Sequence, residues 1–318
     1  MLQMVINRFG DFGSAVIAGL SQPTKTIAAR FFYDCRGSEL FEEITRLPEY
    51  YPTRTETALL ETHAHDIARL TGLGRPVVEF GSGSSAKTPI LLGAIEPTAY
   101  LPIDISADFL SSSAHALAAA HPAIAVIPIA GDFTDPILLP EGVKGPFVGF
   151  FPGSTIGNFP PRQAVDLLRS FRDTLGPEAI LVIGIDTRKN PRLLEAAYDD
   201  ASGITAAFNL NLLHRMNREL DGDIDVDIFA HRIRWHDGLG RIEMHLEATR
   251  ATEFKVAGHV FSMRAGETIH TENSYKYLPA EARLLARASG WEPMTMWIDR
   301  DAMFGLHVWR APAEHREP

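Results

Sequence analysis

The chain has 318 residues, of which 45% are hydrophobic and 22% charged, and its mean hydropathy is −0.03. This composition is typical of soluble globular proteins and excludes disordered, collagen-like and coiled-coil chains. Forty acidic against thirty basic residues give a formal net charge of −10. Phosphate backbones and anionic membrane surfaces bind proteins with an excess of basic residues, which this chain lacks. We therefore expect neither a nucleic acid nor a membrane as partner.

Cysteine usage and the start of the chain predict the compartment. Cys35 is the single cysteine, so the chain can form neither an intrachain disulfide nor a thiolate metal cluster. Residues 1–20 lack a basic segment followed by a continuous apolar one, and the longest apolar runs are too short to span a bilayer. We therefore expect a cytoplasmic protein, and we expect it to be a monomer.

The chain order predicts helices in residues 1–54, followed by alternating strands and helices. Short β-branched or aromatic runs alternate with helical patterns, as in a parallel sheet with crossover helices. Pro160 and Pro161 lie where the fourth crossover helix begins, and Gly176 with Pro177 ends it. The expected strands are residues 77–80, 100–104, 125–129, 147–151 and 180–186.

The remaining segments follow other patterns. Residues 192–201 and 211–220 are predicted helices, and 242–246 alternate as a strand does. A helix over 280–289 ends at Gly290, and the turn at 299–301 joins the strands 292–298 and 305–309 into an antiparallel pair.

Five parallel strands completed by a helix and a terminal hairpin are the plan of class I methyltransferases that use S-adenosylmethionine (SAM). Most nicotinamide-binding Rossmann domains lack that hairpin. We therefore predict an α/β, Rossmann-like methyltransferase core made of residues 55–187 and 278–318. Residues 1–54 and 188–277 do not fit its sheet and are expected to form a second, α+β substrate-binding lobe.

The first core strand runs into a glycine-rich turn, Gly81-Ser82-Gly83-Ser84-Ser85-Ala86-Lys87-Thr88. Glycine lets the backbone approach a ligand, and the following helix start offers unpaired N–H groups. The G-x-G-x-x-A pattern also serves dinucleotides, and a tight turn without a ligand has the same appearance. A phosphate-binding P-loop is excluded because Ala86 stands before Lys87 and one residue separates the two glycines.

Two further strand ends carry polar residues. Asp104 ends the next strand, where a carboxylate can accept hydrogen bonds from the ribose hydroxyls of either SAM or a dinucleotide. Asp132 and Phe133 follow the third strand, where SAM enzymes commonly place a polar group toward the adenine amino group and an apolar one beside the ring. Ligands of open α/β sheets bind at these carboxyl ends, so together the positions favour a nucleoside cofactor.

The loop after the fourth strand, residues 152–159, contains Gly153 and Asn158. Methyltransferases acting on nitrogen often hold the acceptor amine with an amide here. Capping of the next helix explains Asn158 about equally well.

The histidines and acidic runs predict no metal site. His63, His65, His231, His236 and His245 show no H-E-x-x-H or similar zinc spacing. The alternating aspartates between 221 and 227 lack the glycine and glutamate of a calcium loop, so we interpret them as a solvated turn.

Over nearly its whole length, from about residue 31 to 308, the chain closely resembles the L-histidine Nα-methyltransferases of ergothioneine biosynthesis. Cys35, where alanine is commoner, is one departure. The resemblance is carried by the segments 33–41, 47–56, 81–88, 153–158, 197–200, 205–209 and 271–274.

The resemblance implies a reaction and a set of site residues. Family members transfer three methyl groups in succession from SAM to the α-amino nitrogen of histidine, giving hercynine, and need no metal. For the cofactor it implies contacts from Gly81, Gly83, Lys87, Asp104, Asp132 and Phe133. For histidine it implies Tyr50, Gly153, Asn158, Tyr198, Met244, Glu272 and Ser274, with Asn158 orienting the amine and Tyr33 near it as catalytic residues.

The proposed chemistry needs alignment more than a nucleophile. Methyl transfer from a sulfonium is an in-line displacement, so the amine lone pair must lie behind the methyl carbon, away from water. The amine must also lose its proton, and we expect loss through water past Tyr33. The alternatives are a nicotinamide oxidoreductase, which the terminal hairpin argues against, and a non-catalytic SAM- or amino-acid-binding regulator.

Overall fold

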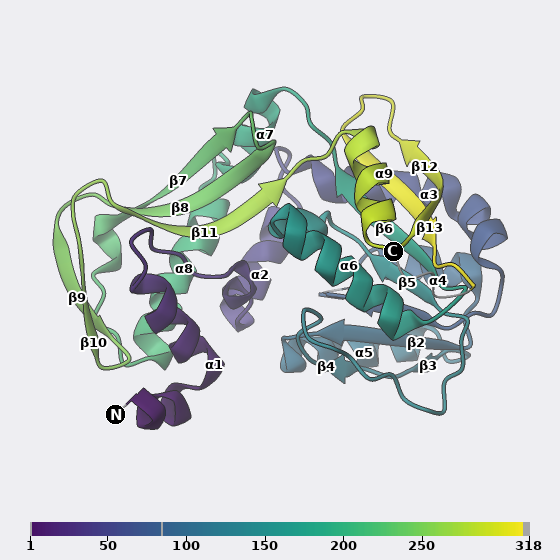
Figure 1. Cartoon of the computed structure of the whole chain (residues 1–318), viewed down its shortest axis with the longest axis horizontal. Coiled ribbons are helices and arrows are strands. Elements are labelled where there is room, and N and C mark those ends of the chain that lie inside the picture. Colours follow the sequence, from purple (N-terminus) through teal and green to yellow (C-terminus); the bar gives the residue numbers. More distant parts are fainter. Residues whose placement is uncertain (1, 84, 314–318) are drawn as a thin grey trace. The chain divides into compact units, whose positions relative to one another are not determined.

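A computed structural model describes residues 2–83 and 85–313, with the side chains of residues 2–8 outside the description. Ser84 of the glycine-rich turn therefore lies outside the described residues. The chain forms two compact units (Figure 1). Unit 1 comprises Met1–Tyr50 and Asn190–Ser274, and unit 2 comprises Tyr51–Lys189 and Tyr275–Pro318. Each boundary lies a few residues from the expected ones at 54/55, 187/188 and 277/278.

Unit 2 contains the predicted sheet, in the order β12-β13-β6-β5-β1-β2-β3, with β4 also paired to β2. The strands β2, β1, β5 and β6 are parallel neighbours, while β13 runs antiparallel to both β6 and β12. This confirms the predicted α/β fold and its terminal hairpin. The strands are β1 (Val77–Phe80), β2 (Ala99–Asp104), β3 (Ala125–Val126), β4 (Ile129–Ala130), β5 (Val148–Phe151), β6 (Ile180–Asp186), β12 (Glu292–Ile298) and β13 (Phe304–Arg310).

The third strand was expected to be continuous over 125–129, and this is wrong. Two short strands, β3 and β4, replace it and both pair with β2. Pro128 lies between them, and proline has no N–H to donate to a ladder.

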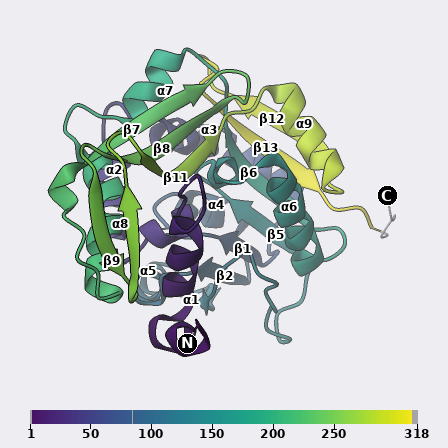
Figure 2. The ribbon, with the colours of Figure 1, turned by 60° about the vertical axis from the view of Figure 1, so that its left-hand side comes forward.

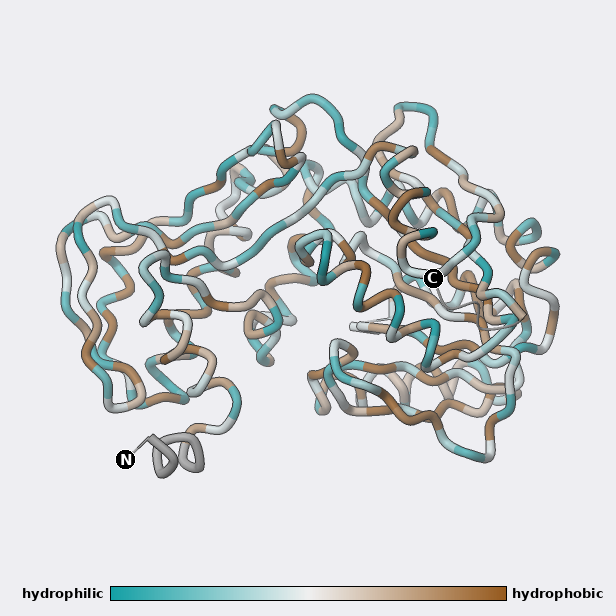
Figure 3. Tube along the Cα trace, viewed as in Figure 1, coloured by the Kyte–Doolittle hydropathy of each residue, from teal (hydrophilic) through white to brown (hydrophobic). Residues whose placement is uncertain are grey.

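Helices cover both faces of this sheet. Along β6, Leu181, Ile183 and Ile185 pack in one hydrophobic cluster with residues of α6 and α9, while Ile180 and Val182 pack in another with residues of α3 and α4. Side chains alternate across a strand, and because both faces are covered β6 is buried throughout and begins with four apolar residues. Figure 3 shows the hydropathy along the described part of the chain. The helices are α3 (Tyr51–Thr71), α4 (Thr88–Ile95), α5 (Ala107–Ala120), the 3-10 turn η2 (Thr155–Asn158), α6 (Pro161–Leu175) and α9 (Pro279–Ala288).

Unit 1 has a three-stranded sheet, β11-β8-β7, and a separate β9–β10 hairpin (Figure 2). Its α8 packs on β7 and β8, where Asn209 of α8 bonds to His231 of β7 at 2.9 Å. The elements are α1 (Leu2–Leu20), η1 (Ala29–Phe32), α2 (Cys35–Ile44), α7 (Pro191–Tyr198), α8 (Ile204–Glu219), η3 (Val226–Ile228), β7 (Phe229–His236), β8 (Arg241–Ala248), β9 (Thr252–Val256), β10 (His259–Met263) and β11 (Thr268–Tyr275).

Helix boundaries in unit 1 differ from the expected ones. The helix expected over 211–220 begins at Ile204, because the carboxylate of Asp200 accepts the N–H groups of Ile204 at 3.0 Å and Thr205 at 2.8 Å. Such a cap satisfies N–H groups that have no partner within the helix. The alternating segment 242–246 does form a strand, β8.

Candidate active site

The glycine-rich turn of unit 2 follows β1 and adopts left-handed backbone angles at Gly81 (φ +72°) and Gly83 (φ +49°). Asp104, at the end of β2, holds this turn. Its Oδ2 accepts the Gly83 N–H at 2.9 Å, and its Oδ1 accepts the Ser106 N–H, also at 2.9 Å. Each oxygen keeps a second lone pair for a ligand hydroxyl, so Asp104 orders the turn and can still accept from a ribose.

Phe133 lies against the same turn. A Cβ on Gly81 would come within 3.0 Å of the Phe133 ring, so glycine is needed there for this close packing. The ring also packs edge-on against Phe151 at 5.6 Å between centroids. Asp132 accepts from the Thr134 N–H at 2.9 Å and its hydroxyl at 2.6 Å, which fixes the backbone beside Phe133.

Sequence reasoning missed Glu56, a carboxylate of α3 that is fully buried. It forms an ion pair with Lys87, at the start of α4, and its Oε2 accepts the Gly153 N–H at 2.8 Å. A Cβ on Gly184 of β6 would overlap its Oε1, and that oxygen is buried without a hydrogen-bond partner among the described atoms. Glu56 therefore links the cofactor turn to the loop after β5, two segments that the sequence treats separately.

A second buried carboxylate lies beneath the turn. Glu79 of β1 accepts hydrogen bonds from the hydroxyls of Tyr100 and Thr88, each at 2.7 Å. Burial raises the pKa of Glu79 to about 7. The group supports the start of α4, where Lys87 lies.

Asn158 ends the 3-10 turn that follows Gly153. The helix α6 begins at Pro161 with Pro160 as its N-cap, and among the described residues no side chain caps it. The capping explanation for Asn158 is therefore wrong, and its half-buried amide is available for another role.

In unit 1, aromatic side chains bring the three expected tyrosines together. The Phe41 ring lies 5.6 Å from that of Tyr33 and 6.3 Å from that of Tyr50, centroid to centroid. Tyr50 in turn lies 6.5 Å from Tyr198, at the end of α7. Segments far apart in the sequence thus present one aromatic surface.

Tyr198 connects this surface to the sheet of unit 1. Its hydroxyl lies 2.6 Å from the Ser274 hydroxyl of β11, and both side chains are buried. The neighbouring strand β8 carries Met244, whose carbonyl accepts the Thr271 hydroxyl at 3.1 Å. Glu272 follows Thr271 on β11, half-buried. Met244, Glu272 and Ser274 therefore lie on the adjacent strands β8 and β11 of unit 1, and Ser274 contacts Tyr198.

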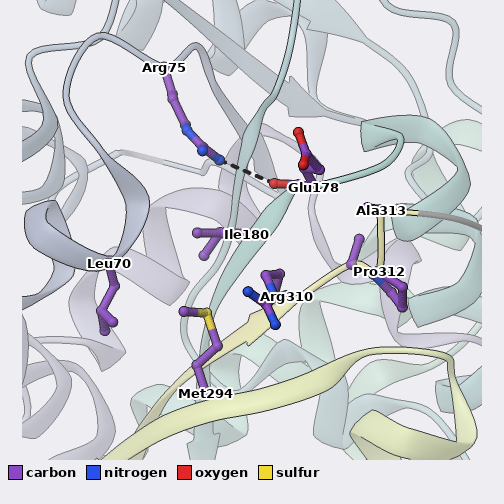
Figure 4. Close-up of a pocket in the computed structure, with 9 residues that line it drawn as sticks. Leu70, Arg75, Glu178, Ile180, Met294, Arg310, Pro312 and Ala313 are labelled. Atoms are coloured by element: carbon purple, nitrogen blue, oxygen red, sulfur yellow. Dashed lines mark hydrogen bonds between the residues drawn. The ribbon is translucent and has the colours of Figure 1, made fainter.

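A cavity of about 640 Å³ lies elsewhere in unit 2 (Figure 4). Its walls include Ile180, the first residue of β6, and Arg75, which donates to the Glu178 carbonyl at 3.1 Å. These residues mark the amino ends of the parallel strands, whereas the glycine turn follows a carboxyl end. The cavity contains none of the expected site residues.

Comparison with known proteins identifies the family. The model of a family described as "Histidine-specific methyltransferase, SAM-dependent" matches residues 12–311. The chain belongs to this family. It is therefore a SAM-dependent methyltransferase, which excludes the nicotinamide oxidoreductase considered above.

Individual relatives agree with this assignment. The chain is 40% identical over 303 residues to the histidine N-alpha-methyltransferase of Mycolicibacterium smegmatis, covering 92% of each chain. It is 31% identical over 288 residues to the ergothioneine biosynthesis protein 1 of Neurospora crassa, covering 87% of this chain and 32% of that longer protein. The CcbJ methyltransferase from Streptomyces caelestis has a similar fold, with a TM-score of 0.50 at 18% identity over 88% of this chain and 100% of that one.

Among the described helices, none is long and apolar enough to cross a bilayer.

Proposed function

We propose that this protein transfers three methyl groups in succession from SAM to the α-amino nitrogen of L-histidine, producing hercynine for ergothioneine biosynthesis. The observation that carries the proposal is the 40% identity to a histidine N-alpha-methyltransferase along 92% of both chains. That alignment spans both units, so it includes the cofactor turn as well as the sheet with Glu272.

On the cofactor side, we assign SAM to the residues around the glycine turn of unit 2. Gly81 and Gly83 let the backbone approach the ligand, and Asp104 accepts from the ribose. Lys87, oriented by Glu56, binds the carboxylate of the methionine part, since an ammonium pairs with a carboxylate. Asp132 and Phe133 hold the adenine by a hydrogen bond and by contact with the ring.

On the substrate side, we assign the imidazole to Glu272 and Ser274, with Met244 lining its pocket. A carboxylate accepts one ring N–H, and a hydroxyl serves the other nitrogen. Tyr198 binds the histidine carboxylate, and its hydrogen bond to Ser274 couples the two contacts. We assign Tyr50 and Asn158, with the backbone at Gly153, to the amino and carboxylate ends of histidine, and Tyr33 to the neighbourhood of the amine.

In each transfer, the amine nitrogen forms a bond to the methyl carbon while the carbon–sulfur bond breaks and its electron pair stays on sulfur. In the first two transfers the side-chain oxygen of Asn158 orients the lone pair by accepting an amine N–H. The third transfer starts from a neutral tertiary amine, which has no N–H to donate, so its alignment depends on the shape of the pocket.

The first two products are ammonium ions that must each lose a proton before the next transfer. Glu56, a buried carboxylate of unit 2, is already paired with Lys87. The buried Glu79 and Asp186 are likewise held by hydrogen bonds or ion pairs within unit 2. We therefore assign proton loss to water beside Tyr33.

The test is mass spectrometry of small molecules after incubation of the purified chain with SAM and each common amino acid. Histidine should gain three methyl groups. Glu272→Ala should lose the preference for histidine, whereas Glu253→Ala, an exposed carboxylate on β9 of the same unit, should keep it. Methylation of another amino acid would overturn the substrate, and SAM binding without any turnover would favour a regulator.

A further inference from the structure

Three side chains of unit 1 bring metal-ligating atoms together outside the site described above. Glu243 and His245 lie two residues apart on β8, and His270 lies on the adjacent strand β11. One ligand atom from each lies within 4.8 Å of the other two. Residues two apart on a strand share a face, so Glu243 and His245 lie on the face opposite Met244. The spacing of a helical zinc motif could not reveal ligands drawn from two strands.

The Glu243 carboxylate is at the centre of this cluster. Its Oε2 lies 3.0 Å from the Nε2 atoms of both His245 and His236, and its Oε1 pairs with Arg241. His245 is only 4% exposed, and its Nδ1 is buried with no hydrogen-bond partner among the described residues. The Nε2 atom is the ring nitrogen of His245 that faces Glu243, and it is therefore the atom that can bind an ion within this cluster.

We propose that Glu243, His245 and His270 form a binding site for a divalent transition-metal cation, with Zn²⁺ as the best-fitting ion. Imidazole and carboxylate are ligands that Zn²⁺ accepts, and two nitrogens with one oxygen leave a fourth position open. His236, whose side chain is 42% exposed, lies at the solvent side of the carboxylate and can fill that position. Side-chain rotation brings the three atoms to the roughly 3.4 Å spacing of a tetrahedral site.

Nearby cations oppose this binding but do not prevent it. Arg241 holds Oε1 and leaves Oε2 for the ion, as partners of metal-binding carboxylates commonly do. Arg234 lies opposite Glu243 on β7, but it is exposed and therefore screened by solvent. A bound ion would bridge β8 to β11 and stabilise unit 1.

Zinc titration of the tag-free chain tests the site, after treatment with a chelator and desalting. Calorimetry with ZnCl₂ and elemental analysis should give one Zn²⁺ per chain, and the melting temperature should rise. His270→Gln should weaken binding at least tenfold, and Glu243→Gln should do the same. His115→Gln, which removes an exposed histidine of α5 in unit 2, is the matched control and should bind as the native chain does.

Co²⁺ in place of Zn²⁺ gives a second measurement, because its visible absorption reports the ligands directly. His270→Gln should change that spectrum while its far-ultraviolet circular dichroism stays native. Equal zinc affinity in His270→Gln and the native chain would overturn the proposal. So would an absence of binding to the native chain, which would leave the cluster as a hydrogen-bonded group around Glu243.

Discussion

Glu56→Gln tests the cofactor end of the active site most directly. The substitution keeps the side-chain length and an oxygen that can accept the Gly153 N–H, but removes the negative charge. Lys87, whose side chain is 15% exposed, then loses the carboxylate that pairs with it. Removing one partner of a buried ion pair costs about 3–5 kcal/mol, chiefly because the other charge stays desolvated.

The expected loss is at the lower end of that range, about 3 kcal/mol, because Lys87 keeps some contact with solvent. For a unit of this size each kcal/mol shifts the melting temperature by about 2–4 °C, so we expect a fall of about 6–12 °C. Lys87 also loses its fixed position, so the KM for SAM should rise more than the KM for histidine.

Thermal unfolding followed by circular dichroism measures the first effect, and initial rates at varied SAM measure the second. Glu61→Gln is the matched control, since it makes the same change on an exposed side chain of the same helix α3. A melting temperature and a KM for SAM equal to those of the Glu61 variant would refute the reasoning. The ion pair would then neither stabilise unit 2 nor position Lys87.

Four other substitutions have expected outcomes. Burial raises the pKa of Glu79 to about 7, so its contribution to the free energy of unfolding is present below about pH 4.5 and is lost as pH rises through 7. In urea unfolding, the native chain should therefore lose on the order of 3 kcal/mol between pH 5 and pH 8, and Glu79→Gln should reduce this loss. Asp186→Asn removes a carboxylate whose Oδ2 lies 2.8 Å from the fully buried Lys276 ammonium, and should lower the free energy of unfolding by about 3–5 kcal/mol in the same assay. Tyr198→Phe and Ser274→Ala should each lower kcat/KM for histidine roughly fivefold, about 1 kcal/mol, and the double variant should lose less than the sum of the two because either single change already removes the hydrogen bond between these hydroxyls.

Much of the unit 2 sheet could be predicted from the sequence because its buried parallel strands are short, mostly apolar runs. Val148–Phe151 and Ile180–Asp186 are buried on both faces and therefore carry no alternation that could mislead. The prediction was wrong where a single residue overrides the local pattern. Pro128 splits the third strand because it cannot donate to the ladder, and Asp200 moves the start of α8 to Ile204 by capping it.

The part of the candidate site formed by neighbouring strand ends could also be predicted from the sequence. The turn at Gly81 and Gly83 lies within a few residues of its strand, and Asp104 ends the strand next to it, so one rule about strand ends locates all three. No such rule locates Glu243, His245 and His270, because a residue on β8 and one on β11 can face each other at any sequence separation.

Glu56 is a site residue whose burial could not be predicted from its own position in the sequence. A glutamate inside an amphipathic helix is most often solvated, so nothing at position 56 itself marks a buried ion pair. The signal lies in the strand that faces it, because Gly184 interrupts the apolar run of β6. Glycine inside a strand often marks the close approach of another group, and here that group is the Glu56 carboxylate. Gly184→Ala should therefore perturb the Lys87 ion pair as Glu56→Gln does, with a lower melting temperature and a raised KM for SAM, and a native KM would show that the strand tolerates the added methyl group.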